Sequence, residues 1–180
     1  MRIAVYCSAK DAIPEEYLAL GDALGRWLGE QGHTLVYGGA TGGLMSRTSD
    51  AAKAAGAKVI GVIPPRIKTI GRLAKNCDEL IEVANMSERK QTMRDWAEAF
   101  VCLPGSYGTL DEMLDVTSSA IVGEHHKPIY VVNYKGFYEP LKQQIVHMKE
   151  LHFIPEGELY GIVFVDTLAE LFERINSSNH

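Results

Sequence analysis

Residues 33–44 read HTLVYGGATGGL, an apolar run that passes directly into a glycine-rich turn and then into a helical pattern. Residues 100–112, FVCLPGSYGTLDE, repeat this arrangement. Short, uniformly apolar strands that lead through such turns into helices are typical of parallel sheets, which helices cover on both faces. Ligands of these sheets bind beyond the carboxyl ends of the strands, which is where both glycine-rich turns fall.

The same alternation continues on either side of these two stretches. Strands are expected over residues 2–8, 33–37, 57–63, 78–84, 100–103, 128–133 and 162–165. Helices are expected over residues 17–28, 44–55, 109–122, 138–151 and 168–175, and a further helix is expected to start at Ser87 as its N-cap. Residues 64–76 show no regular pattern. The alternation predicts an α/β fold, a Rossmann-like three-layer sandwich with a mostly parallel sheet of about seven strands, in a single domain over residues 1–180.

Composition excludes several classes of protein. The 180 residues are 46% hydrophobic and 23% charged, as expected for a globular chain with a sizeable core. With 18 Lys and Arg against 23 Asp and Glu, the net charge of −5 provides no basic field for a nucleic acid polymer. No apolar run approaches the ~18 residues of a membrane span, and strand-like sequence starts at Arg2 without a leader pattern. We therefore expect a cytoplasmic protein.

Neither the cysteines nor the histidines form a recognisable site. Cys7, Cys77 and Cys102 have no CxxC spacing, which favours reduced thiols over a disulfide framework or a zinc site. The pair His125-His126 belongs to no spaced set of ligands. We therefore expect solvated loop histidines and no bound metal.

The first glycine-rich turn does not fit two well-known nucleotide motifs. A dinucleotide fingerprint, Gly-x-Gly-x-x-Gly, fails whether it starts at Gly38 or at Gly39, since alanine or threonine occupies its second glycine position. A Walker A loop requires Lys directly after Gly43, where Leu44 stands. What remains is a turn that leads into a helix N-terminus, which is either a phosphate site or only a tight connection.

The second turn brings Gly105, Ser106, Gly108, Thr109 and Glu112 to the start of one helix. Thr109-x-x-Glu112 also fits a capping box, in which both side chains bind the helix's own amides. The carboxylate is therefore either a catalytic group or a capping group.

Two adjacent cations, Arg89 and Lys90, lie between the two turns, near the start of the helix expected at Ser87. Cations at a helix N-terminus oppose the helix dipole, and an anionic ligand would offset that cost. The alternative interpretation is a solvated basic pair that Glu88 and Asp95 compensate.

Residues 104–112, PGSYGTLDE, resemble the PGGxGTxxE signature of the "lonely guy" family, the cytokinin riboside 5′-monophosphate phosphoribohydrolases, which long carried the label lysine decarboxylase. Three further features agree: the VYCS opening at residues 5–8, the GGATGGLM loop at residues 38–45, and the Arg89-Lys90 pair upstream of the signature. The resemblance covers essentially the whole chain.

This resemblance implies a hydrolase that cleaves the N-glycosidic bond of a nucleoside 5′-monophosphate, such as isopentenyl-AMP or AMP, to free base and ribose 5-phosphate without a cofactor. The family's catalytic arginine and glutamate fall on Arg89 and Glu112. The substrate-binding positions that it implies are Ser8, Gly39, Gly42, Gly43, Met86, Lys90, Gly105, Ser106, Tyr107, Gly108, Thr109 and Thr117. It further implies a homodimer with the active site near the subunit interface.

Two positions depart from the family pattern. Ser106 replaces the second glycine of the signature, and Ser46 stands where the first loop usually ends in glycine. Serine is small and can donate a hydrogen bond, so we expect a shift in substrate preference rather than loss of the site.

The chemistry explains why an arginine and a carboxylate are needed. Breaking the bond between C1′ and the base builds positive charge on the ribose, as in glycoside hydrolysis. Glu112 would stabilise that charge or orient the attacking water, and the planar guanidinium of Arg89 suits the substrate's anionic or hydroxyl groups. A second class of function stays open, because the family resembles molybdenum-cofactor carriers of the same fold: a nucleotide or cofactor carrier that binds without hydrolysing.

Overall fold

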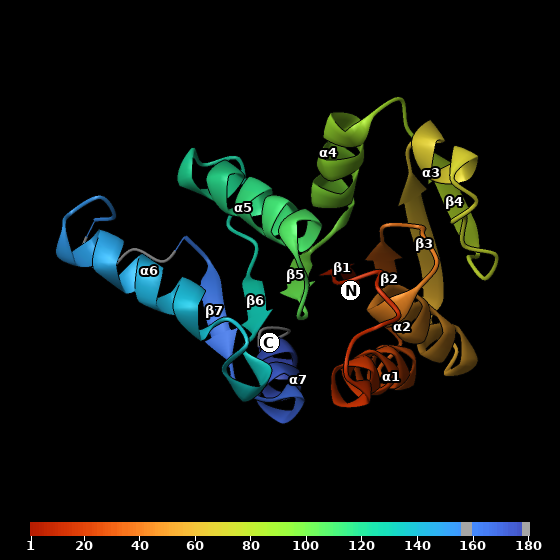
Figure 1. The fold of residues 1–180 in the computed structure, drawn as a ribbon, viewed down its shortest axis with the longest axis horizontal. Helices are drawn as coiled ribbons and strands as arrows, with labels where there is room; N and C mark the ends of the chain where they lie inside the picture. Colours follow the sequence, from red (N-terminus) through yellow and green to blue (C-terminus); the bar gives the residue numbers. More distant parts are fainter. Residues whose placement is uncertain (156–159, 178–180) are drawn as a thin grey trace.

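The computed structural model describes residues 1–155 and 160–177. Within these residues a seven-stranded sheet has the order β4-β3-β2-β1-β5-β6-β7, and all neighbouring strands are parallel (Figure 1). The strands are β1 (Arg2–Tyr6), β2 (Thr34–Tyr37), β3 (Lys58–Ile63), β4 (Glu79–Glu82), β5 (Ala99–Cys102), β6 (Ile129–Val132) and β7 (Ile162–Val165). The helices are α1 (Glu15–Glu30), α2 (Gly43–Ala54), α3 (Pro65–Thr69), α4 (Met86–Trp96), α5 (Tyr107–Ile121), α6 (Glu139–Glu150) and α7 (Leu168–Ser177). The predicted α/β sandwich is confirmed.

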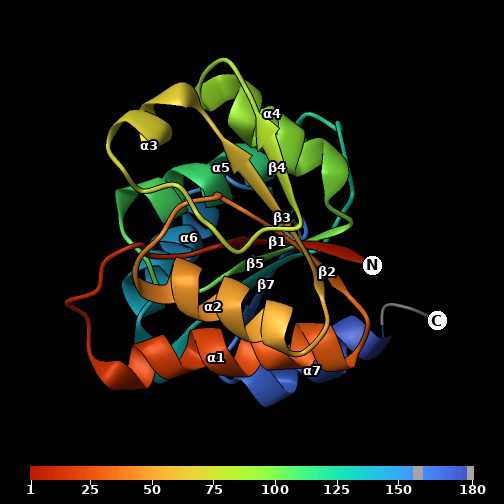
Figure 2. The same ribbon diagram turned by 90° about the vertical axis from the view of Figure 1, so that its right-hand side faces the viewer.

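Helices cover both faces of the sheet (Figure 2). Helices α1, α2 and α7 lie on one face, and α3, α4, α5 and α6 lie on the other. Alternate residues of each strand point to opposite layers: Ile3 and Val5 of β1 pack with the first group of helices, whereas Ala4 and Tyr6 pack with the second. The central strands β5 and β6 are apolar and fully buried because helices cover both faces of the sheet there, whereas the edge strand β4 carries Glu79 and Glu82 and has no fully buried residue.

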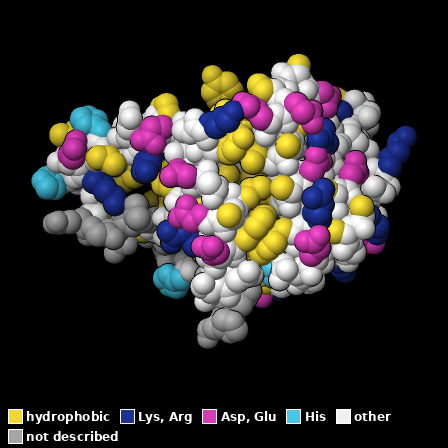
Figure 3. Space-filling model, turned by 90° about the horizontal axis from the view of Figure 1, so that it is seen from below, with side chains coloured by type: hydrophobic (Ala, Val, Ile, Leu, Met, Phe, Trp, Pro, Cys, Tyr) yellow, Lys and Arg dark blue, Asp and Glu magenta, His cyan; other side chains and the backbone are white. Residues whose placement is uncertain are grey.

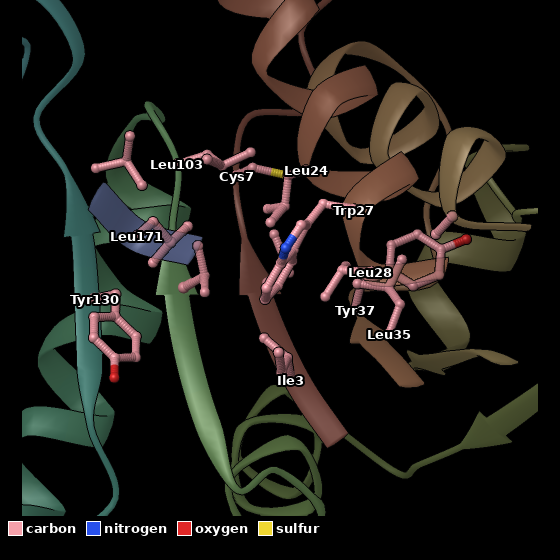
Figure 4. Close-up of a cluster of buried hydrophobic side chains, with 14 of the residues drawn as sticks. Ile3, Cys7, Leu24, Trp27, Leu28, Leu35, Tyr37, Leu103, Tyr130 and Leu171 are labelled. Carbon is pink, nitrogen blue, oxygen red and sulfur yellow. The ribbon is translucent and has the colours of Figure 1, made fainter. Parts of the chain in front are cut away.

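The layer under α1 and α7 anchors the centre of the sheet. Leu24 and Leu28 of α1 and Leu171 of α7 are fully buried against the strands (Figure 4). Trp27 of α1 also stacks on Phe172 of α7, with the ring centroids 4.4 Å apart. Each fully buried leucine stabilises the fold by about 1.5–3 kcal/mol. On the outer side of α1 and α7, hydrophobic side chains gather among charged ones (Figure 3).

The order of the strands reverses between β1 and β5. From β1 the chain adds β2, β3 and β4 outwards, and it then returns through α4 to β5 on the other side of β1. The loops after β1 and β5 remain neighbours there, since the amide of Ser8 donates to the carbonyl of Pro104 at 3.3 Å. Open parallel sheets bind ligands at such a reversal, so the candidate site belongs above β1 and β5.

The start of α4 differs from the sequence prediction. Asn85, not Ser87, is the N-cap: its Oδ1 accepts from the amide of Glu88 at 3.0 Å. The Glu88 carboxylate in turn accepts from the amide of Ala84 at 2.7 Å. Ser87 was the wrong choice because asparagine caps at least as well as serine and stands two residues earlier, which leaves Ser87 inside the first turn.

The start of α5 also differs. The helix begins at Tyr107, two residues before the predicted start, with Ser106 at the N-cap position. Thr109 therefore lies inside the helix, buried, and Glu112 bonds to Arg89 of α4. The capping-box interpretation of these two residues is wrong.

Two further expectations need correction. Residues 64–76 contain the short helix α3, which the pattern missed; it begins at Pro65, a residue that suits the first helical position because it has no N–H to satisfy. His125 is buried rather than solvated, with its Nε2 2.8 Å from the carbonyl of Val116, whereas His126 is exposed.

Across the residues that the structure describes, none of the helices is both long and apolar enough to cross a membrane.

Candidate active site

A cleft of about 280 Å³ opens at the carboxyl ends of β1, β2 and β5. Its walls come from the loops after these strands, from the segment that holds α3, from the first turns of α2 and α4, and from the first two turns of α5. The residues that line it are Cys7, Ser8, Ala9, Lys10, Gly38, Ala40, Met45, Ile67, Ile70, Arg72, Met86, Arg89, Ser106, Gly108, Thr109, Asp111 and Glu112. The cleft thus lies at the reversal of strand order, where the fold predicts a ligand.

A buried ion pair forms the floor of the cleft. Arg89 Nη1 of α4 lies 2.5 Å from Glu112 Oε1 of α5, and both side chains are about 5% exposed. The Nε of Arg89 donates to the carbonyl of Val62 at the end of β3, at 3.1 Å. The guanidinium is therefore held from two sides in a fixed plane. The interpretation of Arg89 as part of a solvated basic pair is wrong.

Gly38 allows the guanidinium to lie this deep. A Cβ at this position would be 2.1 Å from Nη2 of Arg89, much closer than real Cβ contacts. The first glycine-rich turn therefore has a specific steric role: the absence of a side chain at Gly38 makes room for Arg89.

Burial raises the pKa of the Glu112 carboxyl above its ordinary value, and the charge and hydrogen bond of Arg89 oppose that effect. A carboxyl in such surroundings holds a proton more readily than one in water. Raised pKa values of this kind are common among groups that transfer protons in active sites. The pair therefore combines a permanent positive charge with a carboxyl that is able to exchange a proton.

Lys90 follows Arg89 on α4 but does not line the cleft. Its Nζ lies 2.9 Å from Asp111 Oδ1 and 3.3 Å from Asp115 Oδ1, both on α5. These contacts hold α4 and α5 together beside the Arg89–Glu112 pair. The predicted role of Lys90 in substrate binding stays a prediction.

The signature loop brings only part of its predicted residues to the cleft. Ser106, Gly108 and Thr109 line it. Gly105 lies just behind, where a Cβ would be 2.0 Å from Thr109 Oγ1, and the side chain of Tyr107 is 90% exposed.

Thr117 lies further along α5 and does not line the cleft. It is buried, and its hydroxyl donates to the carbonyl of Met113 at 2.8 Å.

The other glycines of the first turn are likewise engaged within the chain. The amide of Gly42 donates to Ser46 Oγ at 2.8 Å, and the amide of Gly43 donates to Asp11 Oδ1 at 2.7 Å. Ser46 thus has a structural role that a glycine at this position cannot supply. Gly39, Gly42 and Gly43 do not line the cleft, and their role in substrate binding stays a prediction.

Several residues that line the cleft belong to no motif of the sequence. Ile67, Ile70 and Arg72 belong to the segment 64–76, which the pattern left without structure, and which folds back over the first glycine-rich turn through a bridge between Leu73 and Ala40. No motif points to these side chains or to Lys10, because only the path of the chain brings them to the cleft. Ser8 and Met86, which the resemblance implied, do line it.

The thiol of Cys7 also reaches the cleft, but burial raises its pKa, so it stays protonated at neutral pH and is a poor nucleophile. Within residues 1–155 and 160–177, no group of three or more His, Cys, Asp and Glu side chains is placed to hold a metal ion.

Sequence comparison finds a matching family model and similar proteins. The family model described as "Possible lysine decarboxylase" matches residues 45–175. The chain is 36% identical to cytokinin riboside 5′-monophosphate phosphoribohydrolase of Mycobacterium marinum over 95% of this chain and 91% of that protein. It is 39% identical to the enzyme of the same name, LOG, of Oryza sativa subsp. japonica over 97% of this chain and 72% of that protein.

Solved structures show the same fold in more distant proteins. The molybdenum cofactor binding protein of Rippkaea orientalis superposes with a TM-score of 0.74 at 18% identity, covering 99% of this chain and 97% of that one. The molybdenum cofactor carrier protein of Chlamydomonas reinhardtii gives a TM-score of 0.72 at 18% identity, covering 98% and 96%. At this level of identity the likeness shows the fold alone. The match to the family model and the similarity to the two phosphoribohydrolases over nearly the whole chain establish that this chain belongs to the "lonely guy" family of cytokinin riboside 5′-monophosphate phosphoribohydrolases.

Proposed function

We propose that this chain hydrolyses the N-glycosidic bond of nucleoside 5′-monophosphates, such as isopentenyl-AMP or AMP, to free base and ribose 5-phosphate. The observation that carries the proposal is the buried Arg89–Glu112 pair on the floor of the cleft. A charged pair is expensive to bury, and it is retained most readily where the charges have a chemical use. The names of the relatives agree with this chemistry.

We assign the central step to Glu112. Departure of the base leaves positive charge on C1′ and the ring oxygen of the ribose. A carboxylate at the floor of the cleft stabilises that charge at short range, where little water screens it. With its raised pKa, Glu112 is also suited to accept the proton of the attacking water.

Arg89 keeps Glu112 in place and supplies a fixed positive charge. Its Nη1 holds one carboxylate oxygen, and the carbonyl of Val62 holds its Nε. The guanidinium stays charged throughout, so it stabilises negative charge on a hydroxyl or on the departing base without giving up a proton. Neither role requires the pair to separate before the substrate binds.

The two ends of the substrate find different surroundings in the cleft. Ser106, Gly108 and Thr109 surround the N-terminus of α5, whose amides suit the 5′-phosphate. Met45, Ile67, Ile70 and Met86 supply apolar surface on which a purine can lie. Binding of the phosphate then positions C1′ at the Arg89–Glu112 pair, so an uncharged nucleoside should react far more slowly.

Incubation of the purified protein with AMP and with isopentenyl-AMP tests this proposal, with free base and ribose 5-phosphate measured by chromatography. We expect both products in equal amounts. If neither these nor other purine and pyrimidine monophosphates are cleaved, the enzyme proposal fails. Tight binding of the nucleotide without turnover, unchanged in Glu112→Gln, would instead support a carrier.

We also propose that the chain acts as a homodimer, as one unit over residues 1–180, in the cytoplasm. Tyr107, Leu114 and Ile121 recur at heptad spacing along α5 and are exposed, which leaves an apolar stripe beside the cleft. The three free cysteines are consistent with a reducing compartment. Sedimentation equilibrium tests the dimer, and a species of only about 20 kDa at all concentrations would contradict it.

A further inference from the structure

Two cations that line the cleft, Lys10 and Arg72, have no carboxylate partner among the residues that the structure describes. Both acids that line the cleft are already paired with cations of α4: Glu112 lies 2.5 Å from Arg89, and Asp111 lies 2.9 Å from Lys90. In the described part of the chain, neither Lys10 nor Arg72 forms an ion pair. The wall of the cleft thus has uncompensated positive charge.

The polar groups next to these cations form no ion pair with them in the described part of the chain. Asp11 follows Lys10 directly, but its Oδ1 accepts from the amide of Gly43 at 2.7 Å. Arg72 Nη1 approaches the carbonyl of Ala9 at 3.5 Å, which is long for a hydrogen bond. Most donors of the guanidinium are therefore left for another acceptor.

Both side chains stand on backbone that is fixed. The carbonyl of Arg72 accepts from the amide of Thr41 at 2.8 Å, and the amide of Ala74 donates to the carbonyl of Gly39 at 2.9 Å. These bonds hold the segment that carries Arg72 against the first glycine-rich turn. The amide of Lys10 donates to Ser8 Oγ at 3.1 Å.

Lys10 lies beside the signature loop. It lines a second hollow together with Pro104, Gly105 and Ser106, next to the main cleft. An anion at the N-terminus of α5 would therefore have the signature loop on one side and a lysine on the other. The amides of Gly42 and Gly43 at the N-terminus of α2 are already bonded within the chain, which favours the N-terminus of α5 as the anchor for the phosphate.

We propose that Lys10 and Arg72 bind the 5′-phosphate of the substrate, together with the amides at the start of α5. This inference rests on the proposed function and names the residues that select a phosphorylated substrate. The phosphate is the doubly charged group of a nucleoside monophosphate, and the planar fork of arginine matches its oxygens. Arg72, from the segment 64–76, then acts as a specificity residue that favours nucleotides over nucleosides.

The test compares Arg72→Gln and Lys10→Gln with the unchanged protein in steady-state hydrolysis of AMP. Each variant is expected to raise KM for AMP by roughly tenfold or more, because each loses a charged hydrogen bond, with kcat within about threefold. Competitive inhibition by ribose 5-phosphate is expected to weaken by the same factor, and inhibition by adenosine, which has no phosphate, is expected to stay the same. Arg72→Lys keeps the charge and should recover part of the loss.

Arg66→Gln is the matched control, since Arg66 is an exposed cation of α3 that does not line the cleft. It removes one charge from the same segment and is expected to leave KM unchanged. Equal weakening of adenosine and ribose 5-phosphate in Arg72→Gln would show a structural role and overturn the proposal, as would an unchanged KM for AMP.

Calorimetric titration with ribose 5-phosphate separates this inference from the proposed function. If the unchanged protein hydrolyses no monophosphate, the proposed function fails, yet the titration still decides whether Arg72→Gln weakens phosphate binding. If the unchanged protein hydrolyses AMP but the titration curves of the unchanged protein and of Arg72→Gln coincide, the proposed function is supported. The proposed role of Lys10 and Arg72 in binding the phosphate is then contradicted.

Discussion

Gly38 is the position where the smallest substitution should disturb the site most. A Cβ there would lie 2.1 Å from Arg89 Nη2 and 3.3 Å from Cζ, whereas ordinary contact begins near 3.4 Å. In Gly38→Ala the guanidinium therefore has to move by roughly 1.3 Å. Gly38 is not among the glycines with positive φ, so alanine strains no backbone. The cost comes mainly from Arg89, with a smaller contribution from Met45 Cε, which would lie 3.3 Å from the new Cβ.

A displacement of this size breaks the 2.5 Å bond between Arg89 and Glu112. Misplacing a catalytic group by about 1 Å can cost about a hundredfold in rate. Inserting a methyl group into a filled space usually costs about 1–3 kcal/mol of stability. We therefore expect kcat for AMP to fall by about a hundredfold and the free energy of unfolding to fall by about 1–3 kcal/mol.

The assay is release of adenine from AMP, with urea denaturation of the same samples. Arg89→Ala provides the control background, because it removes the guanidinium atoms that the new methyl group would meet and leaves only the milder contact with Met45 Cε at 3.3 Å. In that background Gly38→Ala should have little further effect on the free energy of unfolding. An unchanged kcat in the Arg89 protein, or an equal loss of stability in both backgrounds, would refute the reasoning.

Three further predictions concern Glu112 and the helix that carries Arg89. Glu112→Gln is expected to lower kcat by about 10²–10⁴-fold while calorimetry still detects AMP binding, and full activity would exclude a catalytic role. Burial raises the pKa of Glu112 in the folded protein above the ordinary value of about 4.5 that it has in the unfolded chain. The protonated carboxyl therefore contributes its full stability at pH values below about 4.5, and this contribution is lost as the pH rises through the higher pKa of the folded state. As the pH rises between these two pKa values, the free energy of unfolding of Glu112→Gln should therefore increase relative to that of the unchanged protein. If urea titrations show a difference in the free energy of unfolding that does not vary with pH, the raised pKa is contradicted. Asn85→Ala should destabilise the protein by about 1 kcal/mol through loss of the α4 cap, whereas Ser87→Ala should change it by less than about 0.5 kcal/mol, and the opposite order would contradict the cap assignment.

Periodicity and turn chemistry predicted most of the fold, because short, mostly apolar strands that alternate with helices have few alternatives to a parallel α/β sheet. The failures were local. Ser87 and Asn85 are both good caps, and sequence alone does not decide which one bonds to the Glu88 amide. The short helix α3 has no buried residue, so it produced no apolar pattern to recognise.

Some residues of the candidate site could be predicted from the sequence, and others could not. Arg89 and Glu112 come from different helices, and the resemblance to the family predicted that both are catalytic. In the structure their side chains lie 2.5 Å apart. Lys10 and Arg72 could not be predicted, because neither belongs to a motif and their place in the cleft depends on how the segment 64–76 folds back over the first glycine turn. Sequence motifs identify functional residues that lie close together along the chain, whereas contacts between distant loops become visible only in the three-dimensional structure.

The most direct test of the central claim is a time course of AMP and isopentenyl-AMP hydrolysis by the unchanged protein and by Glu112→Gln in parallel. The Arg89–Glu112 pair predicts that the unchanged protein releases free base and ribose 5-phosphate in equal amounts, and that Glu112→Gln binds the nucleotide but releases at most about a hundredth as much per unit time. Equal rates from the two proteins, or no cleavage by either, would contradict the assignment of this cleft as the site of hydrolysis.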